Sequence, residues 1–141
     1  MRGERPGAVV ASVFGLVAMI SWTLAVKYLA PWCWFLAERF AGRTPAAVPV
    51  MWDFWPVLHA ALAVALWRRW AYAWPFALAV ALGEVAVVTV KFALFLRAPE
   101  WSFWKLLWFT NKIYVLAFFL WLGAWLLGPG RAALAPLRRE V

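Results

Sequence analysis

The sequence predicts an all-α membrane protein, a bundle of four transmembrane helices with an interfacial Trp-rich segment between the first two. Composition is the first reason: 67% of the 141 residues are hydrophobic, 14% are charged and 13 are Trp. A soluble domain of this size cannot bury so much apolar surface, because small domains have a high surface-to-volume ratio. The second reason is that apolar runs long enough to cross a bilayer recur along the chain. These observations exclude a soluble globular domain, a disordered chain and a disulfide-stapled secreted module.

The first predicted span covers residues 8–28. It ends at Lys27 and Tyr28, a cation that can snorkel and an aromatic residue typical of the membrane interface. The following segment, 31–49, mixes aromatic and charged side chains, which is typical of a helix lying at the interface rather than crossing the bilayer. We therefore expect the chain to turn onto the membrane surface after the first span.

The second predicted span covers residues 49–67. Pro49 suits a first helical position, and starting there gives enough length to cross the bilayer. This start places Asp53 in the first turns of the helix, where Pro56 is expected to kink it. Two cations between two interfacial aromatic residues, the Trp-Arg-Arg-Trp run at 67–70, end the span.

The third and fourth predicted spans cover residues 72–96 and 106–127. They are joined by a short turn, and Glu84 lies at the centre of the third. A Gly-Pro-Gly run ends the fourth span, and residues 128–141 form a short basic tail. The chain has no internal repeat, so residues 1–141 are expected to form a single integral membrane domain.

The distribution of cations predicts the orientation. If both termini are cytoplasmic, seven cations lie on the cytoplasmic side and five on the other side. The cytoplasmic set is Arg2, Arg5, Arg68, Arg69, Arg131, Arg138 and Arg139. The opposite set is Lys27, Arg39, Arg43, Arg97 and Lys105. Because cytoplasmic loops carry the excess of Lys and Arg, we predict a bacterial inner-membrane protein with both termini in the cytoplasm.

Several classes of site are excluded by what the sequence lacks. Cys33 is the single cysteine and His59 the single histidine, which excludes a Cys-rich or multi-His metal site. His59 is expected to take a buried hydrogen-bonding role. The sequence contains no Ser-His-Asp set and no phosphate loop, so no catalytic residue, metal or cofactor is predicted. The basic residues are scattered between apolar runs, which argues against nucleic acid as a partner.

Polar residues at membrane depth carry most of the functional signal, because ionisable groups inside a span usually face a cavity or a partner. Glu84 lies roughly 18 Å from either end of its span, so it serves either a ligand or proton site or a structural interhelical hydrogen bond. The remaining polar groups either line a pocket or anchor the helices at the interface. The residues predicted to line one outward-opening cavity with aromatic walls are Asp53, Glu84, Lys91, Asn111, Lys112 and Tyr114.

The layout resembles the EXPERA family, the emopamil-binding-protein-like group of sterol isomerases and the sigma-2 receptor. The closest local likeness is the Phe-Trp pair at 103–104, followed by Asn111 and by Tyr114, which stands where the isomerase has Trp. The Ala-Leu-Gly-Glu run at 81–84 is similar to the signature of the preceding helix. Asp53 stands roughly where the family has an acidic residue opening a helix.

The resemblance implies a shared membrane fold and a sterol-like ligand. It does not imply isomerase activity, because the positions of the family's His and Glu on the first span correspond to the region of Ser21 and Ala25. Double-bond isomerisation needs a proton donor and an acceptor over the ring. Neither group is present at these positions.

Three functional hypotheses follow. The first is a membrane protein that binds a sterol-, isoprenoid- or lipid-like amphiphile, either a mostly apolar ligand with one polar end or a cationic amphiphile, without isomerase chemistry. The second is an accessory subunit of a larger membrane complex, in which Glu84 pairs with a cation of a neighbouring subunit. The third is a small proton-coupled exporter that uses Glu84 as its exchange site and works as a homodimer.

Overall fold

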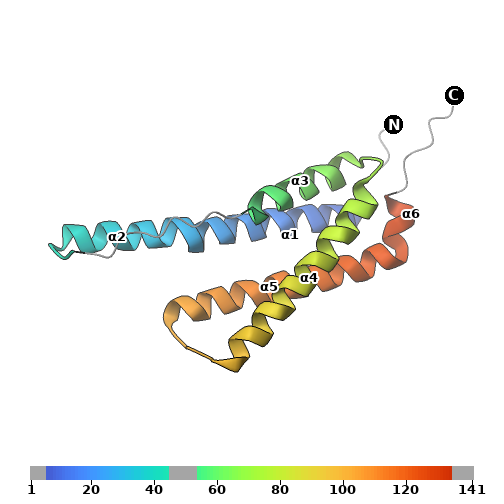
Figure 1. Ribbon diagram of the computed structural model, residues 1–141. Coiled ribbons are helices and arrows are strands. Elements are labelled where there is room, and N and C mark those ends of the chain that lie inside the picture. The colour runs from blue at the N-terminus through green and yellow to red at the C-terminus, as the bar shows by residue number, and fades with distance from the viewer. Residues whose placement is uncertain (1–5, 45–53, 135–141) are drawn as a thin grey trace.

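The computed structural model describes residues 6–44 and 54–134, without the Trp104 side chain, and this part of the chain is helical with no strand (Figure 1). The elements are α-helices apart from two short π-helical stretches, each of which joins two consecutive α-helices. The elements in chain order are α1 (Gly7–Leu24), η1 (Ala25–Leu29), α2 (Ala30–Phe40), α3 (Trp55–Arg68), α4 (Ala73–Arg97), α5 (Phe103–Trp125), η2 (Leu126–Gly130) and α6 (Arg131–Ala133).

Three helical stretches among the described residues are long and apolar enough to cross a membrane. They are Gly7–Phe40, Ala73–Arg97 and Lys105–Ala133. The last two confirm the predicted third and fourth helices, since α4 begins and ends within one residue of 72–96. Their length and composition agree with an integral membrane protein.

The second predicted span, 49–67, is not confirmed as a full crossing. Its described part is α3, which has 14 residues. A helix of that length is about 21 Å long, whereas the hydrocarbon layer is about 30 Å thick. Residues 49–53, including Asp53, lie outside the described residues. The structure therefore shows three membrane-length helices, and a bundle of four spans stays a prediction.

The first helix does not end at Tyr28, which corrects the predicted turn onto the membrane surface. Instead α1, η1 and α2 form one helical stretch of 34 residues, about 51 Å long. A proline at position 31 would ordinarily disturb such a helix, because its ring clashes with the carbonyl of the preceding turn. The π-helical η1 lies immediately before it, and such a wider turn interrupts the regular ladder that proline would disturb.

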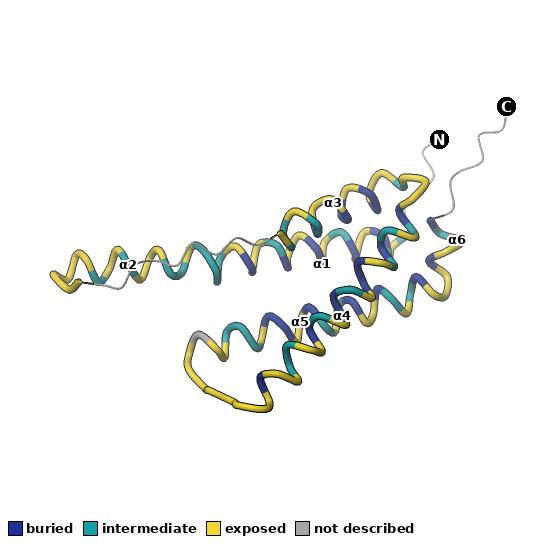
Figure 2. Tube along the Cα trace, in the orientation of Figure 1, coloured by how far each residue is buried: buried dark blue, intermediate teal, exposed yellow. Residues whose placement is uncertain are grey.

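The helices pack as two linked pairs around a small core. α1 packs chiefly against α3 and α4 against α5, while contacts of α1 with α5 and of α3 with α4 join the pairs. Buried side chains from all four helices form the core, among them Leu16, Leu62, Val88 and Phe119. Figure 2 shows that burial is concentrated where these helices meet, whereas α2 has no buried residue and projects beyond the others.

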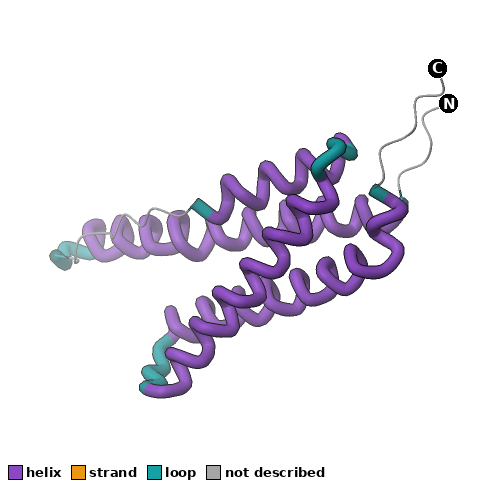
Figure 3. The backbone as a smooth tube through the Cα atoms, turned by 45° about the vertical axis from the view of Figure 1, so that its right-hand side comes forward, coloured by secondary structure: helices purple, strands orange, loops and turns teal. Residues whose placement is uncertain are grey.

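The Gly-Pro-Gly run kinks the last helix rather than ending it. Gly128 has non-helical backbone angles, with φ −99° and ψ −117°, and the chain continues from there into α6. The Trp74 indole donates a hydrogen bond to the Leu126 carbonyl at 2.9 Å, and the Arg131 guanidinium lies 5.3 Å from the Trp74 ring centroid. These contacts link the start of α4 to the kink at η2, and Figure 3 gives a second view of how the helices are arranged.

Candidate functional site

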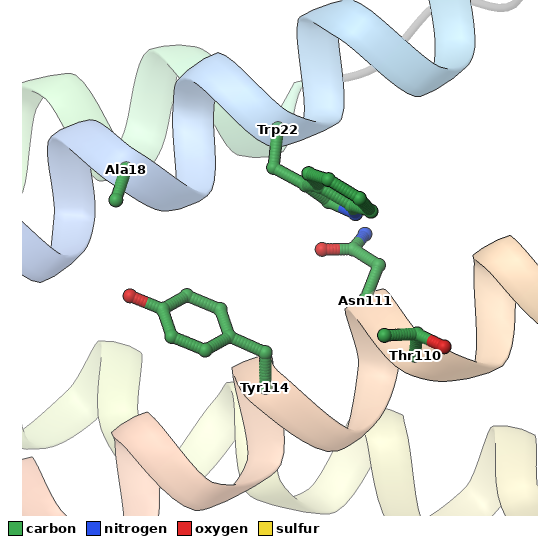
Figure 4. Close-up of a pocket in the computed structure, with 5 residues that line it drawn as sticks. All are labelled: Ala18, Trp22, Thr110, Asn111 and Tyr114. Atoms are coloured by element: carbon green, nitrogen blue, oxygen red, sulfur yellow. The ribbon is translucent and has the colours of Figure 1, made fainter.

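A pocket of about 300 Å³ lies between α1 and α5. It is lined by Ala18, Trp22, Thr110, Asn111 and Tyr114. Figure 4 shows the Asn111 amide projecting from α5 toward the Trp22 ring, while the Tyr114 ring extends across the pocket toward α1. Apart from Asn111, the lining residues are exposed on the surface of the helices. The pocket is therefore open on the side that faces lipid when α1 and α5 cross a bilayer.

Asn111 is the polar residue that gives this pocket its chemistry. Its side chain is only 5% exposed, and its Oδ1 atom has no hydrogen-bond partner. A buried acceptor without a partner costs about 1–3 kcal/mol, so such groups in folded proteins call for an explanation. The two pocket walls beside it are aromatic. Asn111 therefore brings a buried acceptor without a hydrogen-bond partner to the wall of this pocket.

Close packing of α1 against α5 closes one end of the pocket. The Tyr114 hydroxyl donates a hydrogen bond to the Gly15 carbonyl at 3.2 Å. A Cβ atom at Gly15 would lie 2.3 Å from the Phe118 ring, so a side chain there would force the ring to move. The absence of a side chain at Gly15 thus permits the close packing of the two helices. Figure 1 shows α1 and α5 diverging toward α2 and the α4–α5 turn.

The sequence around α5 sets up its pocket face. The Ser102 side chain caps the helix by accepting a hydrogen bond from the Lys105 backbone N–H at 3.2 Å. The Thr110 hydroxyl donates to the Leu106 carbonyl at 3.0 Å, so its proton is used within α5. Asn111 and Tyr114 are three residues apart and therefore lie on the same side of the helix.

Glu84 lies elsewhere, in the core between α3 and α4. Its Oε1 atom is 2.7 Å from Nε2 of His59, and the two side chains are 3% and 5% exposed. The rings of Trp55 and Phe119 flank the imidazole, at centroid distances of 6.0 and 5.4 Å. This contact gives each of the two buried groups a hydrogen-bond partner. The bond thus ties α3 to α4.

This geometry separates residues that the sequence was expected to bring together. Of the six predicted cavity residues, the pocket brings together Asn111 and Tyr114. Glu84 is paired with His59 of the same chain, so it does not require the cation of a neighbouring subunit that the second hypothesis assigned to it. Lys112 is buried at 7% exposure and Lys91 is half-buried, and neither lines the pocket. Asp53 lies outside the described residues.

The α1 wall of the pocket and the partner of Glu84 were missed by the sequence reasoning. Ala18 and Trp22 are four residues apart, which places them on one helix face, but this spacing does not reveal which helix they meet. His59 was expected to form a buried hydrogen bond, and that expectation is confirmed. Its partner, 25 residues further along the chain, has no local signal.

The side chains that line the pocket are apolar or neutral polar ones. None of its five lining residues carries a carboxyl or imidazole group. Among the described residues no group of His, Cys, Asp and Glu is arranged to hold a metal ion. Comparisons with protein families, curated proteins and solved structures found no match to this chain.

Proposed function

We propose that this chain is an integral membrane protein that binds a lipid-like amphiphile, such as a sterol or an isoprenoid alcohol, in the α1–α5 pocket. The observation that carries the proposal is the unpartnered Oδ1 atom of Asn111 in an apolar, aromatic-walled pocket. Ligand sites combine apolar walls with few polar groups that fix the orientation of the ligand. The EXPERA resemblance leads to the same ligand class.

The free acceptor selects the polar end of the ligand. A carboxylate or phosphate offers no proton to an amide oxygen, whereas a hydroxyl or an ammonium group donates one. The neighbouring Trp22 ring can flank a flat apolar body or, through its electron-rich face, an ammonium group. We therefore expect a head group that donates hydrogen bonds, attached to a mostly hydrocarbon body.

The depth of Asn111 agrees with such a ligand. It lies six residues beyond Lys105, where the membrane-length stretch begins, which is about 9 Å along the helix axis. A head group bound there lies below the membrane surface. Its hydrocarbon body can leave the pocket through the open side, between the exposed rings of Trp22 and Tyr114, and lie among lipid chains.

The proposal is tested by replacing Asn111 with Leu, which keeps the approximate volume and removes the acceptor. We expect binding of a radiolabelled sterol or polyprenol to purified protein in detergent to weaken by about five- to tenfold, the worth of one hydrogen bond. The fold should be no less stable, because a buried unmet acceptor has been removed. Ile113→Leu, an exposed change on another face of α5, is the control.

A ligand analogue without the hydroxyl group makes the test specific. We expect the wild-type protein and the Asn111→Leu variant to bind this hydrocarbon equally well. Equal affinity of both proteins for the hydroxylated ligand would contradict the proposal.

A further inference from the structure

A second hollow, of about 500 Å³, lies between α1 and α3. It is lined by Val13, Val17, Ala63, Val64, Trp67 and Arg68. Because successive residues of a helix are turned by about 100°, Val17 and Ala18 point in different directions from α1. This α1–α3 groove is therefore separate from the pocket that Ala18 lines. It is apolar along its length and carries a cation at the end of α3.

Arg68 lines this end of the groove, and a second arginine, Arg69, follows it in the chain. Arg68 is the last residue of α3, and Arg69 follows it in a left-handed conformation with φ 49°. The Nε atom of Arg69 is buried and has no hydrogen-bond partner. Among the described residues neither arginine forms an ion pair. Arginine stays protonated in proteins, so the buried N–H of Arg69 remains a donor. No group nearby in the described chain supplies an acceptor for it.

These arginines lie at the level that lipid head groups occupy when α4 crosses a bilayer. The membrane-length helix α4 begins at Ala73, so residues 68–72 lie where it enters the bilayer. The Trp70 and Tyr72 rings pack 5.3 Å apart in this turn, and such aromatic pairs mark the membrane interface. The groove leads from this level along α3 and α1 toward the bilayer interior, the direction that an acyl chain follows.

We propose that the α1–α3 groove and the adjacent arginines bind an anionic glycerophospholipid. One acyl chain lies along the valines of the groove, and the phosphate accepts hydrogen bonds from Arg68 and from Nε of Arg69. Guanidinium groups match phosphate geometry, and two of them favour a head group of net negative charge over a zwitterionic one. The acyl chain of this lipid covers the apolar groove, and its phosphate supplies the acceptor that Nε of Arg69 lacks.

The test measures lipid retained by the purified full-length chain in native mass spectrometry. Phosphatidylglycerol and phosphatidylcholine with identical acyl chains are offered in mixed micelles. We expect the wild-type protein to retain phosphatidylglycerol preferentially. Arg68→Gln and Arg69→Asn are each expected to weaken this retention about fivefold. Asn is chosen at 69 because it tolerates the left-handed conformation.

A second variant tests the apolar half of the site with both arginines in place. Val64→Trp fills the groove and is expected to reduce retention of phosphatidylglycerol as well. Arg97→Gln, at the exposed far end of α4, is the matched charge control and should change nothing. Asn111→Leu should also leave retention unchanged, which separates this site from the α1–α5 pocket.

Three results would overturn the proposal. One is equal retention of phosphatidylcholine and phosphatidylglycerol by the wild-type protein. Another is a loss of phosphatidylglycerol retention in the Arg97→Gln variant as large as that in Arg68→Gln. The third is displacement of the lipid by millimolar inorganic phosphate without any effect of Val64→Trp, because that pattern describes a site for a free anion.

Discussion

His59 and Glu84 form the most deeply buried polar contact between two helices that the structure describes. Both side chains are almost fully buried, and the rings of Trp55 and Phe119 flank the imidazole. Breaking such a pair from one side leaves a buried charge unpaired, whereas replacing both members with apolar residues removes the problem. The loss of stability on replacing one of these residues therefore depends strongly on whether the other is still present.

We expect His59→Leu to destabilise the fold by about 3–5 kcal/mol, because Glu84 is left without a partner. The double variant His59→Leu/Glu84→Leu should recover most of this loss. Thermal unfolding in detergent micelles, followed by circular dichroism, measures both. A double variant as unstable as the sum of its single changes would show that the two residues act independently.

For single residues, the sequence predicts how deeply a side chain is buried better than it predicts which residue that side chain contacts. Glu84 was placed at the centre of its helix by counting residues, and its near-complete burial agrees with that position. Asn111 and Tyr114 share a helix, so their common face also follows from spacing. The pairing of Glu84 with His59 depends on how two separate helices are rotated about their axes. No local pattern contains that rotation.

At the scale of helices, the contact of α1 with α5 depends on the absence of a side chain at Gly15. The ring of Phe118 occupies the space that a Cβ atom would take, and Tyr114 bonds the carbonyl of the same residue. This is the small-residue packing that brings membrane helices close together. Gly83 on α4 is different, because a Cβ atom there meets nothing within 4 Å.

Substitution by alanine should therefore change the stability of the protein in opposite directions at Gly15 and Gly83. We expect Gly15→Ala to destabilise the protein by about 1–3 kcal/mol through overpacking against Phe118. Gly83→Ala should be neutral or stabilise it by up to about 1 kcal/mol, since alanine is the better helix former. Chemical unfolding in mixed micelles compares the two. Destabilisation of equal size at both positions would contradict the packing argument.

The success of the sequence prediction differs from helix to helix for a physical reason. α4 and α5 are recognised from their length and hydropathy, which are local properties. The continuation of α1 into α2 was missed because the mixed aromatic and charged composition of residues 31–49 is typical of an interfacial helix, and the π-helical turn before Pro31 is not visible as a residue pattern. The crossing assigned to residues 49–67 relied on a start at Pro49, outside the described part of the chain.

For the whole molecule, the 34-residue first helix exceeds the bilayer thickness. α1 and η1 together have 23 residues, since 18 and 5 are joined end to end, and they span about 35 Å. α2 then lies beyond the hydrocarbon layer, where the exposed Glu38–Arg43 ion pair also fits an aqueous setting. Cys33 is exposed on this projecting segment and is the single cysteine of the chain.

The position of α2 is tested with a membrane-impermeant maleimide. We expect Cys33 to be labelled rapidly in intact spheroplasts if the N-terminus is cytoplasmic, and in inverted vesicles if it is not. The control is Cys33→Ser combined with Ser21→Cys, which moves the thiol to the lipid-facing part of α1. We expect this variant to resist the reagent on both sides. Labelling of both thiols at the same rate would place α2 at the same depth as α1.

The sideways opening of the α1–α5 pocket has a thermodynamic consequence. Because Trp22 and Tyr114 are exposed on the side of their helices that faces lipid when α1 and α5 cross a bilayer, the ligand that we propose would exchange with the bilayer and not with water. Occupancy is then governed by the mole fraction of the ligand among membrane lipids. Adding empty micelles dilutes the ligand even at constant aqueous volume, so apparent dissociation constants scale with detergent concentration.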